Sequence, residues 1–428
     1  MESSLDIMQR AARVFTPALH VYYPLPVVRG EGVRVYAADG RSWLDFSSGL
    51  AVLALGHNHP RVVTAVKMQL ENLIHTGGVY FNETTVTAAE KLVSITPVGL
   101  DMLFFSNSGA EAVEGALKVA RYVTGRQGIV SFTGAFHGRT LGALSVTTSS
   151  AAYRKKYHPL LPSVYQAPYP YCFRCPFQRK PDTCGLCCLQ ALDETLKHRI
   201  TADEVAAVII EPFLGEGGYI PAPAAFLVAL RELCTRHGIL LIFDEVQSGM
   251  GRTGHWFASE VSGVVPDILT VAKGIASGFP LSAVVARKEI MELWPSGAHG
   301  TTFGGNPVSC AACSATIDVI QDEALLAKTS SRGATVLDRL RGLAEKYPVI
   351  GDVRCHGLMI GIEFVMPDGS PDHVSCEAVL RHCLENGLIL INCGIERNVI
   401  RFIPPLVTTD QEFEAALGIF HDALRRLL

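Results

Sequence analysis

Hydrophobic residues in the middle of the chain follow two patterns that alternate along the sequence. Short unbroken apolar runs predict buried strands, and they occupy residues 102–105, 129–132, 205–210, 239–243, 268–272 and 282–286. Between them, apolar residues recur at helical intervals and predict helices, as in residues 110–123 and 225–237. Strands that alternate with helices indicate an α/β protein, with a mostly parallel sheet covered by helices on both faces.

The two ends of the chain have a different pattern. Up to about residue 60, short strand-like segments are broken by glycines and by the turn Asp39-Gly40. Beyond about residue 330, the pattern predicts two or three helices together with strands over 356–364, 388–392 and 399–403. We therefore expect a large domain over residues 61–325 and a small α+β domain built from both chain ends, residues 1–60 and 326–428.

Composition narrows the class of protein. Hydrophobic residues make up 48% of the 428 residues, which indicates a thick core or an extensive subunit interface. The net charge is -4, and no block of like charges offers a surface for nucleic acid. No apolar run reaches the length of a membrane span, and the N-terminus lacks the pattern of a signal peptide. We expect a cytoplasmic protein that binds neither nucleic acid nor membranes.

Two polar residues end two of the predicted strands. Asp244 follows the run 239–243, and Lys273 follows the run 268–272. Open α/β sheets bind their ligands at the carboxyl ends of strands. A lysine there can form an imine, and a carboxylate there can pair with a ring nitrogen, so the two residues suit pyridoxal 5'-phosphate. Taken alone, the same two residues are also compatible with a surface ion pair on loops.

The sequence around Asp244 resembles that of a known family. Residues 244–254 read Asp-Glu-Val-Gln-Ser-Gly-Met-Gly-Arg-Thr-Gly, which is similar to the signature of class-III pyridoxal-phosphate aminotransferases, the group of the ornithine and 4-aminobutyrate aminotransferases. The resemblance extends from about Tyr22 to the C-terminus. It implies the aspartate aminotransferase-like fold, fold type I of the pyridoxal-phosphate enzymes, and a homodimer or a dimer of dimers.

The resemblance also assigns residues to the cofactor phosphate. Ser108, Gly109 and Ala110 lie between a predicted strand and a predicted helix, where backbone N–H groups would bind the phosphate. An ordinary helix cap without a ligand would have the same residues. Thr302 matches a threonine that reaches the phosphate of the partner subunit, so a monomer would have an incomplete site.

Around the cofactor ring, the resemblance implies a second set of contacts. Phe136 would stack on the ring, Gln247 would bond the ring hydroxyl, and Asp244 would keep the ring nitrogen protonated. His137 and Glu211 are expected beside the ring. Lys273 would form the imine with the cofactor and then carry a proton between the substrate and the cofactor. Burial and a cationic neighbour would lower the pKa of this lysine.

Substrate binding is expected to depend on charge. By resemblance, Arg401 binds a substrate carboxylate in a bidentate manner, and Glu216 pairs with Arg401 when the substrate has no carboxylate there. Arg139 matches an arginine that holds the distal carboxylate of 4-aminobutyrate or the α-carboxylate of ornithine. Tyr22 resembles a tyrosine of the ornithine site. The same arginines could instead be surface charges.

These residues predict transfer of an amino group from an ω- or α-amino acid to 2-oxoglutarate, by a ping-pong exchange through pyridoxamine phosphate. The alternative is an amino-acid racemase or epimerase of the same family, although the sequence does not locate a second base. A non-catalytic cofactor-binding regulator is disfavoured, because no added DNA-binding segment is present.

Twelve cysteines are present, and five of them lie in a Cys-rich insert, residues 171–188. Within the insert, Cys172-x-x-Cys175 and Cys184-x-x-Cys187 have the form of a four-thiolate zinc site. All four ligands are sulfur, so such a zinc would be structural. The alternative is an insertion loop with reduced thiols or a disulfide. The other seven are expected to be small buried residues in a reducing compartment.

Overall fold

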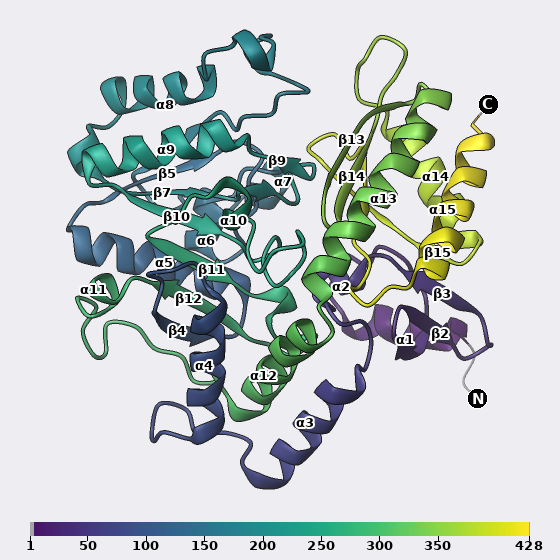
Figure 1. The fold of residues 1–428 in the computed structure, drawn as a ribbon, viewed down its shortest axis with the longest axis horizontal. Helices are drawn as coiled ribbons and strands as arrows, with labels where there is room; N and C mark the ends of the chain where they lie inside the picture. The colour runs from purple at the N-terminus through teal and green to yellow at the C-terminus, as the bar shows by residue number, and fades with distance from the viewer. Residues whose placement is uncertain (1–3, 428) are drawn as a thin grey trace.

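A computed structural model of the protein describes residues 4–427. Its largest feature is a seven-stranded sheet in the order β4-β12-β11-β10-β7-β5-β6 (Figure 1). The strands are β4 (Met102–Ser106), β5 (Gly128–Phe132), β6 (Val164–Ala167), β7 (Val205–Ile210), β10 (Leu240–Asp244), β11 (Ile268–Val271) and β12 (Ser282–Ala286). All are parallel except β12, which is antiparallel to both β4 and β11. The prediction of a mostly parallel α/β sheet is confirmed.

Helices cover both faces of this sheet. Successive strand residues point to opposite faces, so the apolar strands place side chains that need burial on both. In β10, Ile242 packs into the core on the side of α5 (Gly109–Thr124), whereas Leu241 and Phe243 pack on the side of α9 (Ala224–His237). Strands buried on both faces explain the unbroken apolar runs of the sequence. Further helices are α3 (Pro60–Asn72), α4 (Glu83–Ile95), α8 (Cys187–His198) and α12 (Pro307–Asp322). The shorter elements are α2 (Ser48–Ala51), α6 (Leu141–Val146), α7 (Ala151–Arg154), β8 (Phe213–Leu214), β9 (Ile220–Pro221), α10 (Ser259–Ser262) and α11 (Lys288–Met291).

Two four-stranded sheets lie beside the large sheet, and one of them joins the two chain ends (Figure 1). One contains β1 (Val27–Glu31), β2 (Arg34–Ala37), β3 (Ser42–Asp45) and β15 (Leu388–Ile389); the other contains β13 (Ile350–His356), β14 (Met359–Phe364), β17 (Val399–Phe402) and β16 (Ile391–Cys393). The first sheet pairs N-terminal β3 in parallel with C-terminal β15. This pairing supports a small domain built from both ends, while the boundaries at residues 60 and 325 stay predictions.

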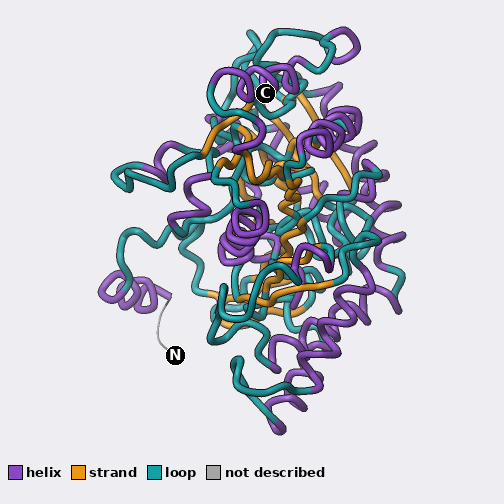
Figure 2. Tube along the Cα trace, turned by 90° about the vertical axis from the view of Figure 1, so that its left-hand side faces the viewer, coloured by secondary structure: helices purple, strands orange, loops and turns teal. Residues whose placement is uncertain are grey.

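Three helices lie in the C-terminal part of the chain, and the N-terminal helix lies away from the rest of the molecule. The former are α13 (Leu325–Lys346), α14 (His373–Glu385) and α15 (Asp410–Arg425), and α13 packs along β13. Helix α1 (Ser4–Val14) projects from the body of the molecule in the side view of Figure 2. The end of this helix and the residue after it are exposed, with Val14 at 76% and Phe15 at 61%.

Two of the predicted C-terminal strands are wrong in detail. Residues 356–364 do not form one strand, because Gly357 has a φ of +55° and turns the chain, so that His356 pairs with Met359 across a hairpin. Residues 388–392 are divided, because Leu388 and Ile389 pair with β3, whereas Ile391 and Asn392 pair with β17 in the other sheet. In both cases the predicted strand covered a change of direction or of sheet that the residue pattern did not show.

The Cys-rich insert covers the loop after β6 and the first residues of α8, and three of its thiols lie beside backbone carbonyl oxygens. Cys187 Sγ lies 2.8 Å from the carbonyl oxygen of Cys184, Cys184 Sγ lies 3.4 Å from that of Pro181, and Cys172 Sγ lies 3.8 Å from that of Pro170. Within residues 4–427, no three His, Cys, Asp or Glu side chains are grouped to hold a metal ion. The structural zinc at Cys172, Cys175, Cys184 and Cys187 is therefore not supported. All the cysteines are free thiols.

Candidate active site

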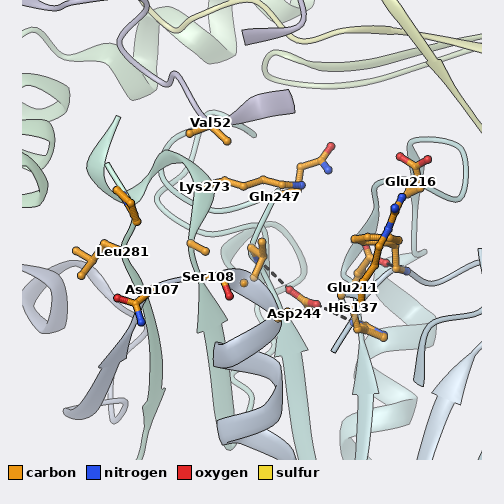
Figure 3. A pocket seen from close by; sticks show the side chains of 18 of the residues that line it. Val52, Asn107, Ser108, His137, Glu211, Glu216, Asp244, Gln247, Lys273 and Leu281 are labelled. Carbon is orange, nitrogen blue, oxygen red and sulfur yellow. Dashed lines mark hydrogen bonds and ion pairs between the residues drawn. The ribbon is translucent and has the colours of Figure 1, made fainter. Parts of the chain in front are cut away.

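A cavity of about 420 Å³ lies at the carboxyl ends of β10 and β11 (Figure 3). It brings together eleven of the site residues expected from the sequence. They are Ser108, Gly109, Ala110, Phe136, His137, Arg139, Glu211, Glu216, Asp244, Gln247 and Lys273. These residues come from loops and strand ends far apart in the chain, which is the usual position of a ligand site in an open α/β sheet.

Asp244 ends β10 at the floor of the cavity and is only 4% exposed. Its Oδ2 lies 2.7 Å from Nδ1 of His137, and its Oδ1 accepts hydrogen bonds from the Val246 N–H at 3.0 Å and the Thr270 hydroxyl at 3.1 Å. Thr270 is directly opposite Asp244 in the β10–β11 register. The carboxylate is therefore held in one orientation, with three hydrogen-bond partners to offset its burial.

Lys273 follows β11 and reaches into the cavity above the strand end that carries Asp244 (Figure 3). Its backbone has a φ of +43°, a left-handed conformation that costs free energy for a residue with a side chain. Burial, and after it the charge of Arg401, lowers the pKa of the Lys273 amine to about 8. An amine with this pKa is partly unprotonated near neutral pH, as a nucleophile or base requires.

The turn before α5 has the geometry of an anion site. The Ser108 hydroxyl accepts the Glu111 N–H at 3.3 Å, and the Glu111 carboxylate accepts the N–H groups of Asn107 at 2.8 Å and Ser108 at 2.9 Å. This capping box uses three of the first N–H groups, whereas those of Gly109 and Ala110 belong to the first helical turn and have no partner within the helix. Both residues line the cavity, so their N–H groups are available to a phosphate.

Glu211 and Phe136 form one wall. The Glu211 carboxylate accepts the N–H of Phe136 at 2.9 Å and that of Gly215 at 2.8 Å. Burial raises the pKa of Glu211 to about 7, and the nearby His137 opposes this rise. Glu211 thus joins the loop that carries Phe136 to the loop that carries Glu216, and it acts as a brace between them.

Glu216 and Arg401 form an ion pair beside the cavity. Arg401 Nη1 lies 3.0 Å from Glu216 Oε2, and Arg401 Nη2 donates to the carbonyl oxygen of Asn392 at 2.8 Å. Burial alone would lower the pKa of Arg401, but the Glu216 carboxylate, together with Cys393 and two nearby tyrosines, raises that pKa. In Figure 3, Glu216 lies across the cavity from Lys273.

Aromatic residues surround this ion pair. The Tyr153 hydroxyl donates to Glu216 Oε1 at 3.4 Å, and the Arg139 guanidinium carbon lies 4.2 Å from the centre of the Tyr153 ring. Arg139 is exposed at the mouth of the cavity. Tyr22 does not line the cavity, but packs against the small cluster that contains Tyr219.

Thr302 is exposed and lies outside this cavity. Its neighbour Phe303 is 63% exposed, and residues 300, 301, 304 and 305 line a separate hollow with residues 76–82. The expected role of Thr302 in a partner's site is compatible with this position and stays a prediction.

Comparisons with known proteins place the chain in a family. The model of the family "Aminotransferase class-III" matches residues 16–424. The chain belongs to the class-III aminotransferases. It is 40% identical to a probable 4-aminobutyrate aminotransferase of Bacillus subtilis over 93% of this chain and 92% of the relative. It is also 40% identical to an alanine/serine racemase of Pyrococcus horikoshii over 99% of this chain and 90% of the relative.

Solved structures agree on the fold. The ornithine aminotransferase from Toxoplasma gondii ME49 superposes with a TM-score of 0.87 at 31% identity, and the match covers 100% of this chain and 96% of that one. The expected fold type I architecture of the pyridoxal-phosphate enzymes is thereby confirmed.

The residues of this class-III aminotransferase fit the cofactor of the family. The cavity offers free N–H groups at a helix start, an aromatic ring at Phe136, a fixed carboxylate at Asp244 and an amine at Lys273. A β-carbon at Gly109 would lie 2.8 Å from Cγ1 of Val246, so the phosphate turn needs glycine to pass beneath the loop after Asp244. These are the groups that pyridoxal 5'-phosphate requires.

Sequence reasoning missed several residues of the site. Tyr219 donates a hydrogen bond to Gln247 Oε1 at 2.5 Å, Thr270 contacts Asp244, and Tyr153 contacts Glu216. Thr270 could have been found, because it lies three residues before Lys273 on a strand beside Asp244. Tyr153 lies in the four-residue helix α7, and Tyr219 lies in the turn between β8 and β9. Both segments are too short for periodicity to mark a side chain as facing the site.

Proposed function

We propose that this enzyme moves an amino group from an ω- or α-amino acid of the 4-aminobutyrate or ornithine type to 2-oxoglutarate, in a ping-pong exchange. The observation that carries the proposal is the Glu216–Arg401 ion pair at 3.0 Å, at the cavity that also contains Lys273. A buried arginine needs a counter-charge. Either Glu216 or a substrate carboxylate can supply it, so the same site can accept substrates with and without that carboxylate.

Lys273 is the residue proposed to move protons. When bound, pyridoxal phosphate supplies an aldehyde and an electron-withdrawing ring. Asp244, oriented by His137, Val246 and Thr270, would hold positive charge at the ring nitrogen. The Lys273 amine, whose pKa is lowered to about 8, would take a proton at Nζ from the substrate carbon and return it on the same side.

A racemase or epimerase is the second candidate, and one relative carries such a name. Racemisation needs a second base on the side of the substrate carbon opposite Lys273. Each carboxylate that lines the cavity has another partner: Asp244 contacts His137, Glu211 holds two backbone N–H groups, and Glu216 pairs with Arg401. This arrangement favours transfer by a single base.

The test is to incubate the purified holoenzyme with single amino acids, including 4-aminobutyrate and ornithine, with and without 2-oxoglutarate. Transamination predicts that glutamate forms only when 2-oxoglutarate is present, and that without it the matching carbonyl product stops at about one equivalent per active site. Loss of optical purity of an amino acid without any acceptor, and no glutamate with it, would replace the proposal with the racemase.

We further propose a homodimer, on its own or within a dimer of dimers. The apolar residues Val79 and Phe81 are 80% and 97% exposed, and Phe303 next to Thr302 is 63% exposed. The hollow of about 720 Å³ that residues 76–82 line with residues near Thr302 offers a place for a second copy. Contiguous exposed apolar residues of this kind are typical of subunit interfaces.

The location of the enzyme stays a prediction. Among the described residues, no helix combines the length and the apolar character needed to cross a lipid bilayer. The free thiols at all cysteines support the expected reducing, cytoplasmic compartment.

A further inference from the structure

The turn that carries Glu216 is supported from behind by a buried arginine. Arg354, on β13, donates from Nε to the carbonyl oxygen of Tyr219 at 2.9 Å and from Nη2 to that of Gly218 at 2.7 Å. Gly218 and Tyr219 have φ values of +136° and +53°. Glycine adopts such a conformation freely, but the left-handed backbone of Tyr219 costs free energy and persists where surrounding contacts hold it.

Arg354 is itself held by acidic partners. Its Nη1 lies 2.6 Å from Glu363 and 2.8 Å from Asp352. Glu363 lies on β14 and is 1% exposed. Burial by itself would raise the pKa of Glu363, but Arg354 and the other donors outweigh it and lower that pKa. The Glu363 carboxylate therefore remains charged and orients the Arg354 guanidinium, which bonds to the turn.

The Cys-rich insert contributes to the same cluster. The Arg174 guanidinium and the Tyr171 hydroxyl both bond to Glu363. Residues 171–188 are thus connected to the active site through one chain of contacts, from Arg174 to Glu363, to Arg354 and to the turn that carries Glu216. Arg174 is half-buried, with a side chain 27% exposed, whereas Arg179 of the same insert is exposed.

The turn that carries Glu216 lies between two cavities. A second cavity, of about 300 Å³, lies behind it and is lined by Gly217, Arg174 and Glu363. Glu216 lines the first cavity, and the next residue lines the second. The turn is closely packed, since a β-carbon at Gly217 would lie 2.3 Å from the carbonyl oxygen of Gly134. The hydrogen bonds of Arg354 add to this packing in fixing the position of Glu216.

We propose that Arg354, braced by Glu363 and by Arg174 of the Cys-rich insert, is a positioning residue that determines how firmly Glu216 covers Arg401. The inference rests on the proposed function, because it assumes that Arg401 alternates between Glu216 and a substrate carboxylate. The Cys-rich insert is then part of the specificity apparatus.

The proposal predicts opposite changes for the two kinds of substrate. A looser turn would free Arg401 for external carboxylates, so a dicarboxylate would bind more tightly. The same change would leave Arg401 without a partner when a donor lacks the carboxylate, so the ω-amine half-reaction would slow. General damage to the fold would weaken both.

The experiment has two measurements on the holoenzyme. Calorimetry gives the Kd of glutarate, a dicarboxylate that does not react, and absorbance gives the rate of the 4-aminobutyrate half-reaction. Arg354→Lys should lower the glutarate Kd and slow the half-reaction, each by about 3- to 10-fold, and Arg174→Met should do so to a smaller extent. Arg179→Met is the matched control and should equal the wild type. In a Glu216→Ala background, Arg354→Lys should have no further effect on the glutarate Kd.

Parallel weakening of both measurements, or an unchanged glutarate Kd, would overturn the proposal. So would additive effects of Arg354→Lys and Glu216→Ala. If Arg354→Lys does not fold, the Arg174→Met variant tests the proposal instead. A glutarate Kd of Arg174→Met equal to that of Arg179→Met would then show that the contacts from Arg174 through Glu363 and Arg354 do not act on Glu216. Glutarate binding needs no turnover, so a wild type that aminates no acceptor would reject the proposed function while the Arg354 test still stands.

Discussion

Nδ1 of His137 lies 2.7 Å from Oδ2 of Asp244, and no part of the His137 side chain is exposed. A carboxylate can only accept in such a contact, so Nδ1 carries the hydrogen. The pair connects the loop after β5 to the end of β10 and sets the direction in which Asp244 faces the cavity.

Replacing His137 should therefore weaken cofactor retention more than it alters the fold. A hydrogen bond to a charged group contributes roughly 1.5–3 kcal/mol, so His137→Ala should weaken pyridoxal-phosphate binding by about 10- to 100-fold. His137→Asn, whose amide can donate to Asp244, should recover part of the loss. Equilibrium dialysis of the cofactor measures both, and His198→Ala, at an exposed histidine of α8, is the control. Equal losses in the Ala and Asn variants would contradict the orienting role.

Lys273 should be the residue that binds the cofactor covalently. Lys273→Ala should lose the visible absorbance that borohydride abolishes, together with nearly all turnover, because no other lysine lines the cavity within the described residues. Lys288→Ala, at an exposed lysine with a 59% exposed side chain, should keep both properties. A Lys273→Ala enzyme that retained the chromophore and the activity would remove this assignment.

The pH dependence of reconstitution follows from the same amine. Burial lowers the pKa of Lys273 to about 8, and only the unprotonated amine can attack an aldehyde. The rate at which apoenzyme regains its visible absorbance from added pyridoxal phosphate should thus rise with pH and level off above a midpoint near 8. A midpoint close to 10, that of an exposed lysine, would show that the amine is solvated.

The Glu216–Arg401 pair should separate the two half-reactions. Arg401→Lys loses a bidentate contact of roughly 1.5–3 kcal/mol, so the 2-oxoglutarate half-reaction should weaken by about 10- to 100-fold. The ω-amine half-reaction should change less, because Glu216 covers the arginine in that complex. Glu216→Ala should do the reverse. Stopped-flow absorbance of each half-reaction measures the effects, and equal losses in both half-reactions would contradict the switch.

The exposed apolar residues around Phe81 should be covered by a second subunit in solution. Phe81 is 97% exposed, and Phe81→Asp would place a charge in the proposed interface. Light scattering should show the wild type as a dimer or larger, and Phe81→Asp should shift it toward the monomer and lower its activity. Val98→Asp, at another exposed apolar residue of 93% exposure, tests whether any exposed apolar position has this effect. An active wild-type monomer at assay concentration would reject the dimer.

The residues that sequence could locate are those at which an apolar run stops. Asp244 and Lys273 follow directly after buried strands, and the cavity indeed lies at those two strand ends. The approach of Glu216 to Arg401 could not be derived in this way, since 185 residues separate them and neither position has a periodic signal. Resemblance to the family supplied that pair.

Sequence could not reveal contacts made through the backbone. Arg354 donates hydrogen bonds to backbone carbonyl oxygens, which every residue has. The residue types at positions 218 and 219 therefore do not identify them as its partners. The cysteine spacing is a different case. Cys172-x-x-Cys175 and Cys184-x-x-Cys187 have the intervals of a zinc site, but intervals along a loop do not determine the geometry of the thiols, and no group that could hold a metal ion is found among the described residues.

The pairing of β3 with β15 has a consequence for synthesis of the chain. Translation proceeds from the N-terminus, so all seven strands of the large sheet, with Lys273, emerge before β15 and before Arg401 on β17. A nascent chain can assemble the amine and the phosphate turn while β3 still has one open edge. That edge is a place where unfinished chains could join one another, and it closes only when the last part of the protein leaves the ribosome and brings the substrate-binding arginine with it.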